Sequence, residues 1–315
     1  MRFLVLLFLS LGLMSCVSKK NQMVQENLLI LKDSYCKAPK QYNYQGKFPS
    51  YNSDSILAAN QHLHDQFTDQ SILILNALGA IDEVEEINKL KKDSTVQAQL
   101  KMLKLKNVIN SKISIALVEL DAVAAEFDCE GERVAQMASY VDQLNDSRNN
   151  RLVLYSIFAG AAASIASGII KSDSWGSAVD IGGGVIGAGL SLATFSPKGR
   201  KVEFIHARNI LRDIWLEKQV SANFPPFVWY MYTEKKFANK SQESIIQNMK
   251  QSWVKYHFHG DQKAADASLL FHDGGIYRAS ELHDRAAMLN QMQSATRTIN
   301  QNINYLLLDL DRFIM

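Results

Sequence analysis

The sequence predicts a mainly α protein, an elongated helical bundle with long amphipathic helices and a central apolar helical hairpin of glycine, alanine and serine. Over two long stretches, apolar residues recur every three or four positions, which is the spacing of one helix face. Hydrophobic residues make up 47% of the 315 residues and charged residues 21%, which excludes general disorder. The 5 prolines are few and the 16 glycines are concentrated in one stretch, so a loop-rich β fold is disfavoured.

The amino terminus has the pattern of a secretion signal. Met1 and Arg2 are followed by an apolar run from Phe3 to Met14. The segment closes with Leu-Met-Ser-Cys at residues 13–16. This ending resembles the signal of bacterial lipoproteins, which is cut before a cysteine that is then acylated. The resemblance implies that residues 1–15 are removed, that Cys16 carries palmitate or a similar acyl chain, and that residues 16–52 form an acylated tether. The alternative is a plain secretory signal or a short anchor.

The same resemblance implies a location in the cell envelope. Residue 17 is valine instead of aspartate, which by analogy with lipoprotein sorting in Gram-negative bacteria implies the outer membrane, with the body facing the periplasm. Each buried methylene of an acyl chain contributes about 0.8 kcal/mol. Through the acylated Cys16, the lipid bilayer is therefore one expected partner.

Two further cysteines, Cys36 and Cys129, remain in the mature chain. In an oxidising compartment they are expected to form a disulfide bond. The alternative is two separately buried thiols.

Residues 53–150 are predicted to form an N-terminal helical region. A helix is expected from Ser53 to Leu78, broken near Gly79 and resumed to Leu90. The best-formed helix follows a capping-box pattern at Ser94 and Gln97. A break is expected at Gly131, after which the helical pattern continues to Leu144. The stripe of the best-formed helix consists of Met102, Leu105, Ile109, Ile113, Ala116, Leu120, Val123 and Phe127.

Residues 198–315 are predicted to form a C-terminal helical region that completes the bundle. Ser280 is expected to cap a last helix with the spacing of a bundle seam. Its seam consists of Leu282, Leu289, Met292, Thr296, Ile299, Ile303, Leu306, Leu310 and Phe313. We expect this seam to pack antiparallel on the Met102–Phe127 stripe, or to self-associate. The segment from Phe224 to Tyr232 is predicted as a kink or loop whose aromatic rings are core or an interfacial belt.

Residues 151–197 are predicted to form a glycine-zipper hairpin. Leu152–Ile170 is uncharged and about 28 Å long as a helix, close to the thickness of a bilayer core. One face of each arm carries only small residues, so the arms can approach closely: Ser156, Gly160, Ser164 and Gly168, then Gly183, Gly187 and Ser191. The segment resembles the two-helix glycine zippers of several outer-membrane lipoproteins. The hairpin is expected to enter a bilayer or an oligomer core, or else to be buried within its own bundle.

The sequence gives little support for catalysis. Gly182–Gly187 matches G-x-G-x-x-G but lacks the strand, helix and acidic residue of a dinucleotide site, so no cofactor is expected. His257, His259 and His272 could contribute to a metal-dependent hydrolase, although ordinary surface histidines explain them better. We therefore expect neither catalytic nor metal-ligating residues.

The formal net charge is +2, from 34 Lys and Arg against 32 Asp and Glu, so nucleic acid is not an expected partner. The pattern favours a non-enzymatic, membrane-anchored lipoprotein that acts as an oligomerising scaffold or as an α-helical pore component. Its expected protein partner is a second copy of the chain or another envelope protein. The main alternative is a periplasmic interaction module with a buried hairpin.

Overall fold

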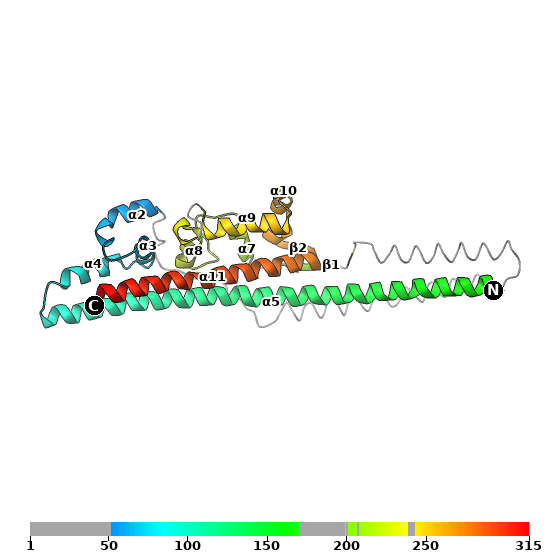
Figure 1. Cartoon of the computed structure of the whole chain (residues 1–315), viewed down its shortest axis with the longest axis horizontal. Coiled ribbons are helices and arrows are strands. Elements are labelled where there is room, and N and C mark those ends of the chain that lie inside the picture. Colours follow the sequence, from blue (N-terminus) through cyan, green and yellow to red (C-terminus); the bar gives the residue numbers. More distant parts are fainter. Residues whose placement is uncertain (1–51, 170–198, 200, 207, 239–242, 315) are drawn as a thin grey trace. The chain divides into compact units, whose positions relative to one another are not determined.

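The structure, a computed structural model, is mainly α-helical, which confirms the predicted fold class (Figure 1). It describes residues 52–169, 199, 201–206, 208–238 and 243–314, without the side chains of residues 148–150, 152–169 and 314. Within these ranges the chain forms two compact units, each built from separate stretches of sequence. Unit 1 contains residues 134–204 and 275–283, and unit 2 contains residues 52–133, 205–274 and 284–314.

Unit 2 begins with three short α-helices and one 3₁₀ turn. They are α2 (Ser53–Ala59), η1 (Gln61–Leu63), α3 (Asp69–Ala77) and α4 (Ile81–Leu90). The prediction of one helix up to Leu78 is wrong, because Thr68 starts a new helix: its side-chain oxygen accepts from the backbone N–H of Ser71. The predicted break at Gly79 is confirmed, with a φ of +60° at that residue.

Helix α5 (Val96–Ile169) is a single helix of 74 residues that contributes to both units. Its cap lies one residue after the predicted Ser94, because Thr95 Oγ1 accepts from the backbone N–H of Ala98. The predicted apolar stripe is confirmed: Ile109 to Phe127 are buried at all six positions, and Met102 and Leu105 are half-buried.

The predicted break at Gly131 is wrong, because α5 continues through it. Gly131 is buried at a point where α5 passes close to the last helix. A Cβ atom at this position would lie 2.7 Å from Asn290 Oδ1, 3.4 Å from Leu289 Cβ and 3.7 Å from the Ala286 carbonyl oxygen. The glycine therefore provides room for a neighbouring helix and does not interrupt its own.

Helix α11 (Ala279–Ile314) confirms the predicted seam, since all nine of its positions are buried. The seam helix lies beside α5 in unit 2 and runs antiparallel to it, as predicted (Figure 1). Lys91, just before α5, donates a hydrogen bond to the carbonyl of Phe313 near the end of α11. Further along α5, Gly131 meets Ala286 and Leu289.

Shorter elements lie between the two long helices in the sequence. They are β1 (Lys201–Ile205), α7 (Ile210–Trp215), α8 (Pro226–Thr233), η2 (Lys235–Phe237), α9 (Ile245–His257), α10 (Gln262–Asp266), η3 (Leu269–Phe271) and β2 (Gly274–Arg278). Strands β1 and β2 form a two-stranded sheet that the sequence did not predict.

Helix α8 occupies the aromatic segment for which a kink or loop was predicted. Pro226 fits there because proline lacks a backbone N–H group, and N–H groups in the first turn of a helix have no partner within the helix. The prediction that these aromatics form core is confirmed, since every side chain from Phe224 to Tyr232 is buried. Tyr232 and Thr296 share a hydrogen bond that links α8 to α11.

A buried carboxylate joins α11 to the start of α3. Asp309 Oδ2 accepts from the Ser71 hydroxyl at 2.6 Å and from the backbone N–H of Thr68 at 3.2 Å. Because Thr68 and Ser71 form the first turn of α3, the negative charge also lies at the favourable end of that helix.

The backbone of the first predicted hairpin arm is helical as far as Ile169, as part of α5. The small side chains of this arm, Ser156 and Ser164 among them, and the whole second arm with Gly183, Gly187 and Ser191 lie outside what the structure describes. Among the described residues, no helix is both long enough and apolar enough to cross a membrane.

We expect Gly131→Leu to lower the free energy of unfolding by about 1–3 kcal/mol, because the added atoms run into Leu289 and the Ala286 carbonyl. Chemical denaturation measures this. Ser139→Leu, at an exposed position of the same helix, is the control and should change stability little. Equal stability of the two variants would contradict the close approach of α11.

Candidate functional site

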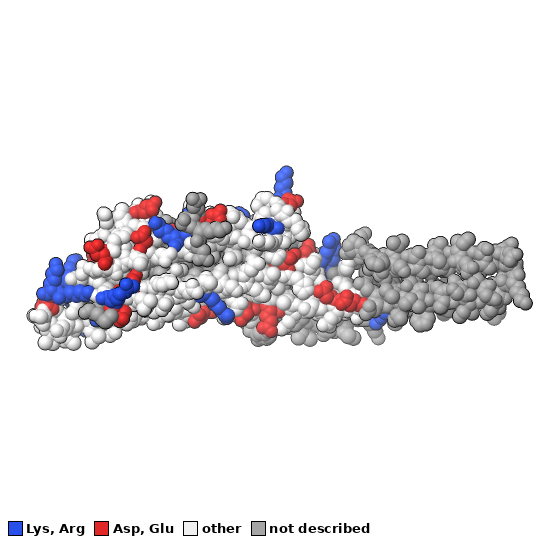
Figure 2. Space-filling view, viewed as in Figure 1, with Lys and Arg blue, Asp and Glu red and all other residues white. Residues whose placement is uncertain are grey.

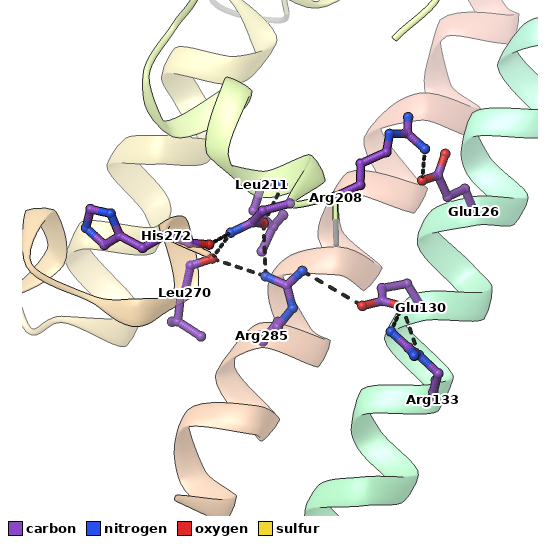
Figure 3. Close-up of polar contacts among 9 residues, drawn as sticks. Glu126, Glu130, Arg133, Arg208, Leu211, Leu270, His272 and Arg285 are labelled. Carbon is purple, nitrogen blue, oxygen red and sulfur yellow. Dashed lines mark hydrogen bonds and ion pairs between the residues drawn. The ribbon is translucent and has the colours of Figure 1, made fainter. Parts of the chain in front are cut away.

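The candidate site is a buried cluster of charged and amide side chains in unit 2, centred on Arg285 of α11 (Figure 3). The Arg285 side chain is wholly buried. Its Nη1 donates to Asn209 Oδ1 at 3.2 Å and to the carbonyl of Leu270 at 3.1 Å. Its Nη2 lies 3.9 Å from Glu130 Oε1 on α5. One guanidinium therefore joins α11 to three other parts of the unit.

Asn209 is the second centre of the cluster. It caps α7, and its Oδ1 accepts from the backbone N–H of Leu211 at 3.2 Å. Its Nδ2 donates to the carbonyl of Leu270 at 2.8 Å and to that of His272 at 2.7 Å. The carboxamide uses both donors and its acceptor, so it fixes the start of α7 against the η3 segment.

Two further ion pairs lie beside this cluster, one from α5 to Arg208 and one within α5. Arg208 binds Glu126, and Arg133 Nε donates to Glu130 Oε2 at 3.0 Å within α5. Burial raises the pKa of Glu126, and the nearby Arg208 charge acts in the opposite direction. Glu130 thus lies between two arginines, Arg133 and Arg285.

His206 is a neutral base beside these cations. Burial, together with the positive charges of Arg285, Arg133 and Arg212, lowers the pKa of His206 from its usual 6.5 to about 2. Its backbone N–H donates to the carbonyl of Asp273 at 2.9 Å.

This geometry is suited to holding helices together. The arginines bind carboxylates and carbonyls of their own chain, and buried charges are destabilising unless they are paired in this way. Within the described part of the chain, no three His, Cys, Asp or Glu side chains are grouped so that they could hold a metal ion. Because the arginines of the cluster are paired within the chain, we assign the cluster a structural function.

The histidines considered for a metal-dependent hydrolase do not converge. His257 Nδ1 lies 2.8 Å from Asp284 Oδ1, and His272 is exposed with Nε2 at 3.2 Å from the Asp266 carbonyl. His259 is exposed in a turn with a φ of +52°. Two other histidines, His62 and His64, lie beside different carboxylates, Glu85 and Asp69 respectively.

The predicted lipidation and disulfide sites are only partly covered by the structure. Cys16 and Cys36 lie outside the described residues, and Cys129 is half-buried on α5. Acylation and the bond between Cys36 and Cys129 therefore stay predictions.

Acidic and basic side chains are interspersed over the described helices on the face shown in Figure 2. That face therefore carries no field of a single sign. The chain matches no protein family, and no characterised protein or solved structure matches it.

The Arg285 cluster was not recognised in the sequence. A signal is nevertheless present, since Arg285 occupies a seam position between Leu282 and Leu289 where an apolar residue is expected. The partners Asn209 and Leu270 come from loops and caps, and no periodicity links these to the seam.

We expect His206 to make the protein less stable in mild acid. The unfolded chain takes up a proton below pH 6.5, whereas the folded chain does so only near pH 2. Stability should therefore fall by about 1.4 kcal/mol per pH unit below 6.5, or about 2 kcal/mol by pH 5.

Urea unfolding of the protein and of His206→Gln between pH 7 and pH 5 measures this contribution. The loss of stability that we assign to His206 should be absent from the variant. All other groups titrate in both proteins, so their effect cancels in the comparison. Parallel pH profiles would contradict the low pKa of His206.

Proposed function

We propose that this protein is a non-enzymatic, lipid-anchored scaffold of the cell envelope, which self-associates through the solvent side of α5. The observation that supports this proposal is a row of apolar side chains on α5 that are 41–71% exposed. The row, termed here the α5 outer face, consists of Val96, Leu100, Leu103, Val108, Ile115 and Val118.

The α5 outer face lies opposite the core side of the helix. At about 100° of rotation per residue, Leu100 and Val118 project half a turn away from Ile109 and Phe127, which are buried. A helix that is apolar on both sides is typical of one that packs between two neighbours. In the described residues only the core side has such a neighbour, which leaves the outer face for a partner.

The charge distribution along α5 favours a second copy of the chain, in antiparallel orientation. Residues 96–112 contain four lysines and no carboxylate, and residues 113–132 contain six carboxylates and no lysine or arginine. Of these carboxylates, Glu126 and Glu130 bind arginines of their own chain. Antiparallel pairing places the basic half of one copy beside the acidic half of the other. Parallel pairing would oppose like charges along the whole contact.

One register satisfies the side-chain sizes as well as the charges. With a two-fold axis between Ser111 and Ser114, each copy places Leu100 and Leu103 opposite Ala125 and Ala122 of the other, by residue spacing alone. Large side chains then face small ones, which lets two helices interlock closely.

The anchoring part of the proposal rests on the sequence. Acylated Cys16 would attach the chain to the lipid bilayer, and a bond from Cys36 to Cys129 would tie the tether to α5. The alternative of an α-helical pore rests on the small-residue faces at Gly160, Gly168 and their neighbours.

We expect the Cys16→Ala protein to be a dimer, and Leu100→Glu with Leu103→Glu to convert it to a monomer. Each buried leucine contributes about 1.5–3 kcal/mol, so the dissociation constant should rise more than tenfold. Light scattering coupled to gel filtration measures the mass.

The matched control is Gln301→Glu with Asn304→Glu, which adds the same charge at the same spacing at exposed positions of α11. This control should remain a dimer, and both variants should keep the helical circular dichroism of the parent. A parent that stays monomeric at high concentration would contradict self-association and favour the interaction module that binds another envelope protein.

We also expect membrane attachment to depend on Cys16. Protein processed in a bacterial envelope should float with liposomes, and Cys16→Ala should remain in the aqueous fraction, because the acyl chains supply the anchor. Flotation of Cys16→Ala that is lost in Gly160→Leu with Gly168→Leu would instead support membrane insertion by the hairpin.

A further inference from the structure

A groove of about 680 Å³ lies in unit 2 between α9 and α11. Its volume is within the range typical of small-molecule sites. The walls are formed by Phe237, Ala238, Ile245, Asn248, Met249, Ser252, Tyr256, Asn290, Gln291, Ser294, Ala295 and Thr298. The groove is separate from the Arg285 cluster and shares no residue with the α5 outer face.

None of these twelve side chains is charged. The polar ones are the carboxamides of Asn248, Asn290 and Gln291 and four hydroxyl groups. A second cavity in the same unit, of about 510 Å³, contains Glu217, Lys250 and other charged side chains. A charged ligand would lose hydration against these twelve described side chains without gaining a counter-charge from them, so the occupant is expected to be neutral.

The orientation of one carboxamide in the groove is fixed by the core. Trp253 is wholly buried, and its Nε1 donates to Gln291 Oε1 at 2.8 Å. Because an indole N–H is only a donor, the oxygen of Gln291 must face Trp253. The Gln291 NH₂ group is then held as a donor at the groove wall.

Tyr256 contributes an aromatic ring to the wall and is 67% exposed. An aromatic ring with a polar tip is a common contact surface where one side of a ligand is apolar and the other is hydrated. Thr298 supplies a hydroxyl oxygen, while its own hydrogen is donated to the Ala295 carbonyl at 2.7 Å.

This mixture fits a carbohydrate better than a peptide. An extended peptide binds by adding to the edge of a sheet, and the walls here are mainly helices, whose backbone groups bond within the helix. A peptide helix needs an apolar groove for its anchors. Sugar hydroxyls both donate and accept hydrogen bonds, as carboxamides do, and the C–H face of a sugar ring can lie on an aromatic ring.

We propose that the groove between α9 and α11 binds a neutral, hydroxyl-rich saccharide, with Tyr256 as the stacking surface and Asn248, Asn290 and Gln291 as hydrogen-bonding groups. This proposal is independent of self-association through α5.

The test uses the Cys16→Ala full chain and two neutral probes, a tetramer of N-acetylglucosamine and cellotetraose, with tetragalacturonate as the anionic comparison. Calorimetry and ligand-observed NMR should detect millimolar or tighter binding of at least one neutral probe and none of the anionic one. No binding of either neutral probe, or equal binding of the anionic probe, would overturn the proposal.

Variants then locate the site. Tyr256→Ala should weaken binding about tenfold, and Tyr256→Phe should retain most of it. Tyr305→Ala is the matched control, because Tyr305 is also exposed but lies on α11 outside the groove. Binding that Tyr256→Ala leaves unchanged, with the variant's helical circular dichroism intact, would place the saccharide elsewhere and contradict the inference.

Discussion

The packing of α5 against α11 is the contact on which the rest of unit 2 depends. The buried stripe of one helix meets the buried seam of the other, and Gly131 allows them to approach closely. Other elements are attached to the same pair: Tyr232 joins α8 to α11, Trp253 joins α9, and Asp309 fixes the start of α3. Burial of this apolar surface supplies the main stabilisation, and the polar contacts determine which helix lies where.

The Arg285 cluster illustrates how polar contacts determine the placement of helices while apolar burial supplies the stability. Replacing a buried charge network by apolar residues is often neutral or stabilising, so such a cluster contributes more to specificity than to stability. Arg285 contacts Asn209 and Leu270 and lies near Glu130, groups that come from three different parts of the chain. A shifted seam would leave the guanidinium buried without these partners, which disfavours alternative registers of α11.

The long helices could be predicted from the sequence because their information is local. Every predicted position of the α11 seam is buried, since a regular 3-4 spacing leaves one face to cover.

Features that depend on a distant neighbour could not be predicted in this way. A glycine that ends a helix and a glycine that makes room for a neighbouring helix look the same in a sequence. The sequence therefore predicts a break at Gly131, where α5 in fact continues. The two prolines before Phe227 predict a kink or loop, although Pro226 occupies the first turn of α8. The groove combines side chains of α9 and α11 that no motif connects.

The separation of α5 and α11 in the sequence affects how the protein is made. Glu130 and Arg285 are 155 residues apart in the sequence. During synthesis the stripe of α5 therefore has no α11 to cover it until that later helix has also been made. Contacts of such long range slow folding and expose apolar surface in the meantime. The export that the proposed lipid anchor requires would use a chain that has not yet folded, and the late synthesis of α11 would keep the chain in that state.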